Sequence, residues 1–206
     1  MKDATAFWDG MARSYADRPI SDPAAYDRTL DRVRSYLAPS DRVLEVGAGT
    51  GTTAIRLRPH VGSYEATDLS DNLIQIARQR AAEADAAPIT FRTADLMERP
   101  EGAPYDVVMA FNLLHLVEDI DTALAHLAGL VKPGGYVITK SACLGSGLHW
   151  MRPMIWVMQQ LGRAPYVAFR NVEELQNAVE RQGLKILETG NYPARPINRF
   201  IVAQKV

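Results

Sequence analysis

The chain has 206 residues, 47% of them hydrophobic and 23% charged, and its formal net charge is −1. This length suits a single domain with a substantial core, so we expect residues 1–206 to form one domain. The near-zero net charge excludes a general attraction to nucleic acid, and we expect no nucleic-acid partner.

The cysteine content and the absence of long apolar runs bear on compartment and metal binding. Cys143 is the only cysteine, which excludes an intrachain disulfide and argues against a thiolate metal cluster. We therefore expect no metal. The first residues lack an apolar core of signal-peptide length, and no apolar stretch is long enough to span a membrane. These features predict a cytoplasmic protein.

Strand-like and helix-like segments alternate from about residue 40 onward. Strands are predicted at 42–46, 63–68, 89–94, 105–111 and 136–140, with a closing pair at 184–191 and 199–204. Helices are predicted near 52–57, after Ser70, over 120–131 and from Asn171 to Gly183. This alternation predicts an α/β fold, a Rossmann-like doubly wound sheet that is mainly parallel.

Two regions lie outside that alternation. Residues 1–40 are predicted to form an N-terminal helical cap in two pieces, the second with an apolar face of Tyr26, Leu30, Val33 and Leu37. Residues 142–170 are predicted to form a helical insert that follows the fifth strand.

The segment from Val43 to Gly51 joins a predicted strand to a glycine turn with the spacing Glu45-x-Gly47-x-Gly49-x-Gly51. Glycines allow the backbone to approach a ligand closely and expose N–H groups where a helix begins. Dinucleotide sites usually space these glycines as G-x-G-x-x-G around a pyrophosphate. A carboxylate before the turn disfavours phosphate and suits a cationic or amino-bearing ligand.

Two further acids follow predicted strands. Asp68 lies 17 residues after Gly51, where a carboxylate can accept hydrogen bonds from a ribose diol. Capping of the next helix is the alternative, but Ser70 already suits that role. Asp95 could accept from an adenine amino group while Leu96 packs on the ring, although an exposed turn aspartate explains the same pattern almost as well.

Together these motifs resemble the class I S-adenosylmethionine-dependent methyltransferases. The resemblance covers about residues 40–140 and includes the segments 43–51, 67–70, 94–96, 106–119 and 130–135. It implies a seven-stranded sheet whose last strand is antiparallel. It also implies S-adenosylmethionine as the cofactor and S-adenosylhomocysteine as its product.

The resemblance assigns roles to individual positions along the cofactor. Glu45, Gly47 and Gly49 would surround the methionine half, and Asp68 would hold the ribose. Ala48, between the two glycines, is a further cofactor-binding candidate. The remaining cofactor-binding candidates are Leu69, Asp95 and Leu96 around the adenine, Phe111 and Asn112 beside the sulfonium, and Tyr15 closing over the cofactor. For Tyr15, packing in the core is an equal alternative.

A general base is needed only if the methyl acceptor arrives protonated. His115 follows the fourth strand at the expected rim of the active site and is the candidate catalytic base. Packing of His115 against a neighbouring loop is the alternative reading.

The insert is rich in tryptophan and methionine, which favours a lid over an apolar or aromatic acceptor. Its predicted lining residues are Trp150, Met151, Met154 and Trp156. A helical hairpin packed on the core is an equal alternative. Peripheral docking to lipid, with Arg152, Arg163 and Arg170 at the rim, is another.

The function predicted from these features is transfer of a methyl group from S-adenosylmethionine to a small, apolar or aromatic acceptor by in-line displacement. A non-catalytic S-adenosylmethionine-binding protein is the first alternative. A nicotinamide-dependent oxidoreductase is the second, and both the glycine spacing and Glu45 argue against it.

Overall fold

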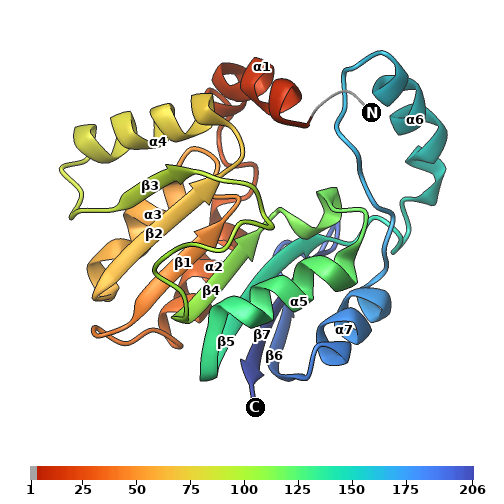
Figure 1. Cartoon of the computed structure of the whole chain (residues 1–206). Coiled ribbons are helices and arrows are strands. Elements are labelled where there is room, and N and C mark those ends of the chain that lie inside the picture. Colours follow the sequence, from red (N-terminus) through yellow and green to blue (C-terminus); the bar gives the residue numbers. More distant parts are fainter. Residues whose placement is uncertain (1–3) are drawn as a thin grey trace.

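The computed structural model describes residues 4–206, which form a seven-stranded sheet with helices on both faces and above one edge (Figure 1). The strands are β1 (Arg42–Val46), β2 (Ser63–Asp68), β3 (Thr90–Thr93), β4 (Tyr105–Phe111), β5 (Val131–Ala142), β6 (Leu184–Asn191) and β7 (Asn198–Lys205). The α-helices are α1 (Ala4–Ala16), α2 (Pro23–Arg34), α3 (Thr52–Leu57), α4 (Asp71–Glu83), α5 (Ile120–Leu130), α6 (Arg152–Gln160) and α7 (Val172–Arg181). Short 3₁₀ turns occur at η1 (Arg58–His60), η2 (Leu114–Leu116) and η3 (His149–Met151).

The strand order is β3-β2-β1-β4-β5-β7-β6. Strands β1 to β5 pair in parallel, whereas β7 is antiparallel to both β5 and β6. The predicted Rossmann-like sheet, mainly parallel with an antiparallel last strand, is therefore confirmed. The strand order reverses between β1 and β4. Open α/β sheets bind ligands at such a point, outside the carboxyl ends of the strands, and we call this side of the sheet its carboxyl edge.

The core consists of two layers separated by the sheet. Alternate side chains of a strand point to opposite faces. In β4, Val108 and Ala110 therefore pack with α5 and α7, while Val107 and Met109 pack with α2, α3 and α4. All four side chains are fully buried, as expected for a central parallel strand covered on both faces.

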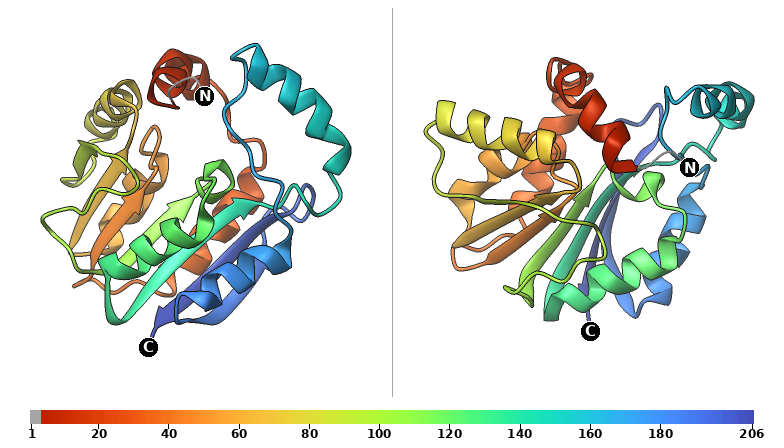
Figure 2. Two further views of the ribbon diagram at one scale, coloured as in Figure 1. Left: turned by 45° about the vertical axis from the view of Figure 1, so that its right-hand side comes forward. Right: turned by 45° about the horizontal axis from the view of Figure 1, so that its top comes forward.

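Helices α1 and α6 lie beyond the carboxyl ends of the parallel strands, as the views of Figures 1 and 2 show. Helix α1 is attached to α4 at two points. The Ser70 hydroxyl donates to the Asp9 carboxylate at 2.6 Å, and the Arg80 guanidinium donates to the carbonyl of Ala16 at 2.6 Å. These bonds hold the predicted N-terminal cap over the edge where the glycine turn lies.

Strand β5 is longer than predicted, because it begins directly where α5 ends. Helix α5 ends at Leu130, and Val131 already pairs with Tyr105, so Pro133 and the following glycines lie within β5. The pairing register then shifts before Val107 meets Tyr136. A Cβ on Gly135 would lie 2.5 Å from the carbonyl oxygen of Asp106, so this close approach of the two strands requires glycine.

Other boundaries differ slightly from the prediction. Strand β3 spans Thr90–Thr93 rather than 89–94, and α2 ends at Arg34 before Leu37. Leu37 nevertheless packs against the same core layer as the rest of the predicted apolar face.

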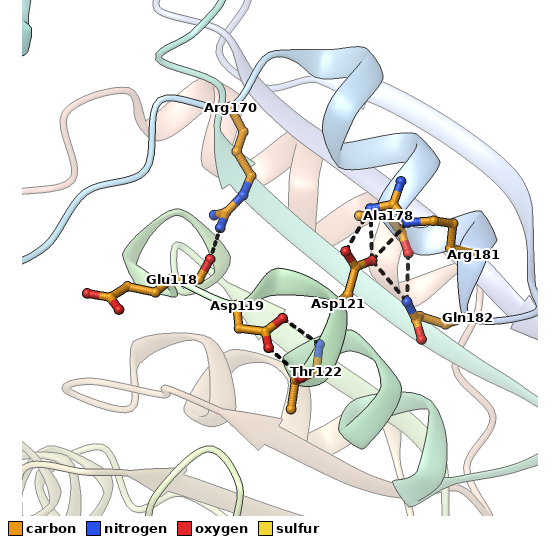
Figure 3. A network of polar contacts seen from close by, with 8 residues as sticks. All are labelled: Glu118, Asp119, Asp121, Thr122, Arg170, Ala178, Arg181 and Gln182. Carbon is orange, nitrogen blue, oxygen red and sulfur yellow. Dashed lines mark hydrogen bonds and ion pairs between the residues drawn. The ribbon is translucent and has the colours of Figure 1, made fainter.

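A polar network joins α5, α7 and the loop after β4 (Figure 3). Asp121 accepts from the Arg181 guanidinium at 2.8 Å and from the side chain of Gln182 at 3.1 Å, which ties α5 to α7. Arg170, at the end of the insert, donates to the carbonyls of Leu114, Val117 and Glu118. Arg170 therefore fixes the η2 turn rather than lying at the rim of a lipid-docking surface.

Candidate active site

The glycine turn crosses the top of the sheet between β1 and α3. Gly47, Gly49 and Gly51 all have positive φ, at 72°, 55° and 73°. A Cβ on Gly47 would lie 3.1 Å from both methyl carbons of Leu113, so the backbone passes close beneath the loop after β4. The sequence motif is thus needed to build the turn.

Asp68 closes the turn from the neighbouring strand. Its carboxylate accepts the Gly49 N–H at 2.9 Å and the Ser70 N–H at 3.0 Å, and the residue is only 7% exposed. Burial raises the pKa of Asp68, while these two N–H groups oppose that rise. Each carboxylate oxygen keeps a further lone pair, which a ribose hydroxyl can use. Ser70 caps α4 by accepting the Leu73 N–H, so Asp68 is not needed as that cap.

Glu45 lies beneath the turn and is 2% exposed. Burial raises the pKa of its carboxyl group to about 8, although the Tyr64 hydroxyl donates to it at 2.8 Å. Glu45 is therefore largely protonated at neutral pH. A cation bound in the adjacent cavity would favour the carboxylate, so Glu45 is suited to a ligand that carries positive charge.

Replacing Glu45 with glutamine should change how stability depends on pH. The pKa of the Glu45 carboxyl in the folded protein lies above its ordinary value of 4.5, so the folded state holds this proton more tightly than the unfolded state does. The stabilisation that this proton gives to the folded state is therefore fully present below pH 4.5 and is lost as pH rises toward about 8. We expect the free energy of unfolding of the wild type to fall relative to Glu45→Gln across this interval. Urea unfolding of both proteins at several pH values measures this, and parallel stability curves would contradict it.

Two cavities flank the glycine turn. The smaller, of about 630 Å³, is lined by Tyr15, Glu45, Gly47, Ala48, Gly49, Phe111 and Asn112 among other residues. The larger, of about 840 Å³, is lined by Leu69, Asp95 and Leu96 among others. The structure thus places the predicted methionine-side residues around one cavity and the predicted adenine-side residues around the other. Asp68 lies between them, where β2 ends beside the turn.

An aromatic pair from α1 spans the two cavities. Trp8 lines the larger cavity and Tyr15 the smaller, and their rings meet edge to face with centroids 5.9 Å apart. Tyr15 is 39% exposed, and its ring carbon would lie 3.5 Å from a Cβ on Gly49. Tyr15 therefore lies over the glycine turn rather than in the core.

His115 lies in η2, and within residues 4–206 it is not among the residues that line either cavity. Burial, with a smaller effect of the Arg170 guanidinium, lowers the pKa of its imidazole to about 4. Such a group is neutral at neutral pH but has low affinity for a proton. The geometry gives no support to the predicted role of His115 as the general base.

The insert contributes to the larger cavity through a different part than predicted. Gln159, Gln160, Gly162, Ala164, Pro165 and Tyr166 line it, opposite α1. Trp150 is 71% exposed and Trp156 is 61% exposed, and Met151 and Met154 are likewise not part of the cavity lining that the described chain forms. The structure therefore does not bring the predicted lining residues to this cavity, and a later part of the insert lines it instead.

The sequence did not predict several polar residues of the smaller cavity, among them Lys140 and Asn198. Lys140 follows Ile138 on the α2 face of β5 and is 6% exposed. Asn198 begins β7 and donates from Nδ2 to the side-chain oxygen of Asn112 at 3.1 Å. In the sequence, the apolar run before Lys140 indicates a buried strand. A lysine at the end of such a strand was the one sign that its side chain is buried.

Comparison with known sequences identifies the family. The profile of a family described as methyltransferase domain matches residues 17–189. The chain belongs to this methyltransferase domain family. Methyl transfer with S-adenosylmethionine as the cofactor is thereby confirmed at the level of the family, and the nicotinamide-dependent alternative is set aside.

Curated relatives of this methyltransferase are much longer proteins. Equisetin synthetase from Fusarium heterosporum is 33% identical over 159 residues, a match covering 65% of this chain and 4% of that protein. The polyketide synthase component of lovastatin nonaketide synthase from Aspergillus terreus is 32% identical over 141 residues, covering 63% and 5%. The chain therefore spans about a twentieth of the length of these relatives.

Solved structures share the fold of this methyltransferase over nearly its whole length. Magnesium protoporphyrin IX methyltransferase from Synechocystis PCC 6803, with bound SAH, has a TM-score of 0.75 at 20% identity, covering 98% of this chain and 97% of that one. The [4+2]-cyclase SpnF has a TM-score of 0.76 at 18% identity, covering 98% and 94%. Among the described residues of the methyltransferase, no helix is long and apolar enough to cross a membrane.

Proposed function

We propose that S-adenosylmethionine lies across the carboxyl edge of the sheet, with its adenine in the larger cavity and its methionine in the smaller one. Asp95, Leu96 and Leu69 surround the adenine, and Asp68 accepts from the ribose diol. The strand order supports this, because β3, β2, β1 and β4 are neighbours in the sheet. The residues at their ends are, in the same order, those proposed for the adenine, the ribose, the methionine and the sulfonium.

The methionine half occupies the part of the smaller cavity beside Glu45, Gly47, Ala48 and Gly49. The buried Glu45 supports this orientation, since it favours the end of the cofactor that carries the ammonium and the sulfonium. Tyr15 covers this half from α1. The glycine N–H groups and carbonyls supply the remaining polar contacts that an amino-acid tail requires.

Phe111 and Asn112 line the passage between the sulfonium and the acceptor. Asn112 has a φ of +53°, a conformation that residues other than glycine rarely adopt and that is frequent at functional sites. S-adenosylmethionine supplies an electrophilic methyl group, and S-adenosylhomocysteine leaves with the electron pair of the broken carbon–sulfur bond. The protein contributes by aligning the acceptor and excluding water, which can provide much of the rate.

We propose that the acceptor is a small apolar or aromatic molecule. Tyr26, Phe111, Ile20 and Pro193 give the smaller cavity an apolar wall beyond the predicted position of the sulfonium. The names of the curated relatives describe polyketide and related synthases, which supports a small organic acceptor over a nucleic acid or a protein. The near-neutral charge of the chain agrees with this choice.

The segment from Gln159 to Tyr166 acts as a lid over the larger cavity in this proposal. It faces Ala4, Phe7 and Trp8 of α1 across that cavity. Movement of either element would open a route for the cofactor. The insert would thus cover the adenosine end of the cofactor rather than the methyl acceptor.

The test is methyl transfer from isotopically labelled S-adenosylmethionine to a broad set of small aromatic and polyketide-like acceptors. We expect labelled product and an equal amount of S-adenosylhomocysteine, both measured by mass spectrometry. Tight binding of S-adenosylmethionine without turnover of any acceptor would favour the non-catalytic alternative. Turnover must be measured as well as binding, because the same fold also occurs in a protein described as a [4+2]-cyclase.

A further inference from the structure

A buried lysine lies at the far end of the smaller cavity. Lys140 is 6% exposed, and its ammonium donates to the Thr29 hydroxyl of α2 at 3.2 Å. Thr29 in turn donates to the carbonyl of Ala25 at 2.8 Å. An ammonium has three N–H donors, and within residues 4–206 Lys140 forms no ion pair and no second side-chain hydrogen bond. Within the described chain the Lys140 ammonium therefore has no direct ion-pair partner, although its side chain is largely buried.

The other charged residues that line the cavity are Arg18, Asp22, Glu45 and Arg80, and in the described chain none of them forms an ion pair with Lys140. Arg80 is bound to the Thr50 hydroxyl and to the carbonyl of Ala16, and Asp22 accepts the Ala25 N–H at the start of α2. Burial lowers the pKa of Lys140 to about 8, and the Asp22 carboxylate opposes that shift only in part. Lys140 remains mostly charged at neutral pH. A buried charge of this kind is costly unless a bound anion compensates it.

A second residue that lines the same cavity has an unsatisfied polar atom. The side-chain oxygen of Asn198 is buried and has no hydrogen-bond partner in the described chain. The Nδ2 group of Asn198 holds Asn112, whose N–H donates to the carbonyl of Lys140 at 2.7 Å. The ends of β4, β5 and β7 thus bring the Lys140 ammonium, with donors to spare, and the buried, unpaired oxygen of Asn198 to residues that line a single cavity.

The strand order separates this group from the cofactor. Asp95, Asp68, Gly47 and Asn112 follow the ends of β3, β2, β1 and β4, which hold the cofactor in the proposed function. Lys140 lies in β5, one strand beyond β4 and paired with Phe111. A ligand that reaches Lys140 therefore lies past the proposed sulfonium, on the side from which an acceptor approaches.

We propose that Lys140 and Asn198 form an acceptor subsite, in which the Lys140 ammonium binds an anionic oxygen and the Asn198 oxygen accepts from a neighbouring hydroxyl or N–H group. The substrate class is an oxygen acid, such as a phenol, enol or carboxylic acid, with a second hydrogen-bond donor nearby. This inference rests on the proposed function. The acceptor would then carry an ionised oxygen group that binds Lys140 and an apolar part that packs against Tyr26 and Phe111.

The experiment measures binding of three probes to the full chain saturated with S-adenosylhomocysteine, by calorimetry or ligand-observed NMR. The probes are 3-hydroxybenzoate, 3-hydroxybenzamide, which lacks the charge, and benzoate, which lacks the second donor. We expect the wild type to prefer 3-hydroxybenzoate over each of the others by roughly 10-fold, the scale of one net hydrogen bond. Equal binding of the three probes, or binding of none, would overturn the subsite.

Variants assign the two preferences to their residues. Lys140→Met should remove the preference for 3-hydroxybenzoate over the benzamide, and Asn198→Leu should remove the preference over benzoate. Lys185→Met is the matched control, because Lys185 is exposed on β6 and should keep both preferences. Lys140→Gln retains a donor to Thr29 and serves if the methionine variant does not fold. Persistence of the charge preference in either Lys140 variant would contradict the proposal.

Affinity for S-adenosylhomocysteine separates this inference from the proposed function. We expect Lys140→Met to bind it within about twofold of the wild type, since Lys140 contacts only the acceptor. A loss of 10-fold or more would mean that Lys140 holds the cofactor carboxylate, which overturns the inference but leaves the proposed function standing. Failure of the wild type to bind S-adenosylhomocysteine would instead overturn the proposed function.

Discussion

Replacing Asp68 with alanine is expected to weaken binding of S-adenosylmethionine by roughly 10- to 100-fold, the range of one or two lost hydrogen bonds to a charged group. Asp68 acts twice in this account. It offers its free lone pairs to the ribose diol, and it accepts the N–H groups of Gly49 and Ser70 that shape the turn. Isothermal titration of the folded variant measures the loss directly.

Asp71→Ala is the matched control for this substitution. Asp71 is an exposed acid three residues further on, where it accepts from Thr93 and Gln75 and lines neither cavity of the described chain. We expect it to bind S-adenosylmethionine within about twofold of the wild type. If Asp68→Ala folds normally and also binds within that margin, the ribose role of Asp68 is wrong.

Replacing Gly51 with alanine is expected to lower the free energy of unfolding by roughly 2–4 kcal/mol, through backbone strain and overpacking together. Gly51 has a φ of +73°, which an L side chain rarely adopts. The new Cβ would also lie 2.9 Å from the Cβ of Ala77 and 3.0 Å from the ring of Phe91. Both neighbours are buried, so neither can move freely. Urea unfolding monitored by circular dichroism measures the change.

Gly129→Ala tests whether the loss depends on the site rather than on removing any glycine. Gly129 lies within α5, and a Cβ there meets nothing within 4 Å. Alanine should therefore raise the free energy of unfolding by about 0.5–1 kcal/mol, because it restricts the unfolded chain and favours the helix. Equal effects of the two substitutions would contradict the account of the glycine turn.

The sheet, and the gathering of the candidate cofactor residues at one of its edges, could be predicted because their signals are local. The apolar run before Gly47, the spacing of the three glycines and the acid after β2 each depend on a few adjacent residues. The carboxyl ends of parallel strands meet at one edge of the sheet, so a parallel sheet brings together the residues that follow these strands. The placement of Asp68 and Asp95 at one edge required no knowledge of distant contacts.

The acceptor end could not be predicted, because it depends on packing between distant segments. Lys140 is buried where β5 packs against α2, and its ammonium contacts Thr29, 111 positions earlier in the chain. The tryptophans of the insert face solvent because η3 and α6 lie away from the core, and apolar composition alone does not say which helix face turns inward. The η2 turn that contains His115 is likewise held by a distant residue, because Arg170 donates to the carbonyls of Leu114 and Val117.

The structure of the protein in complex with S-adenosylhomocysteine is the most direct test of the central claim, that the cofactor crosses the carboxyl edge from β3 to β4. The account predicts adenine beside Asp95 and Leu96, both ribose hydroxyls within hydrogen-bond distance of Asp68, and the amino-acid tail over Gly47 beneath Tyr15. A ligand bound in one cavity alone, or with its ribose away from Asp68, would contradict it.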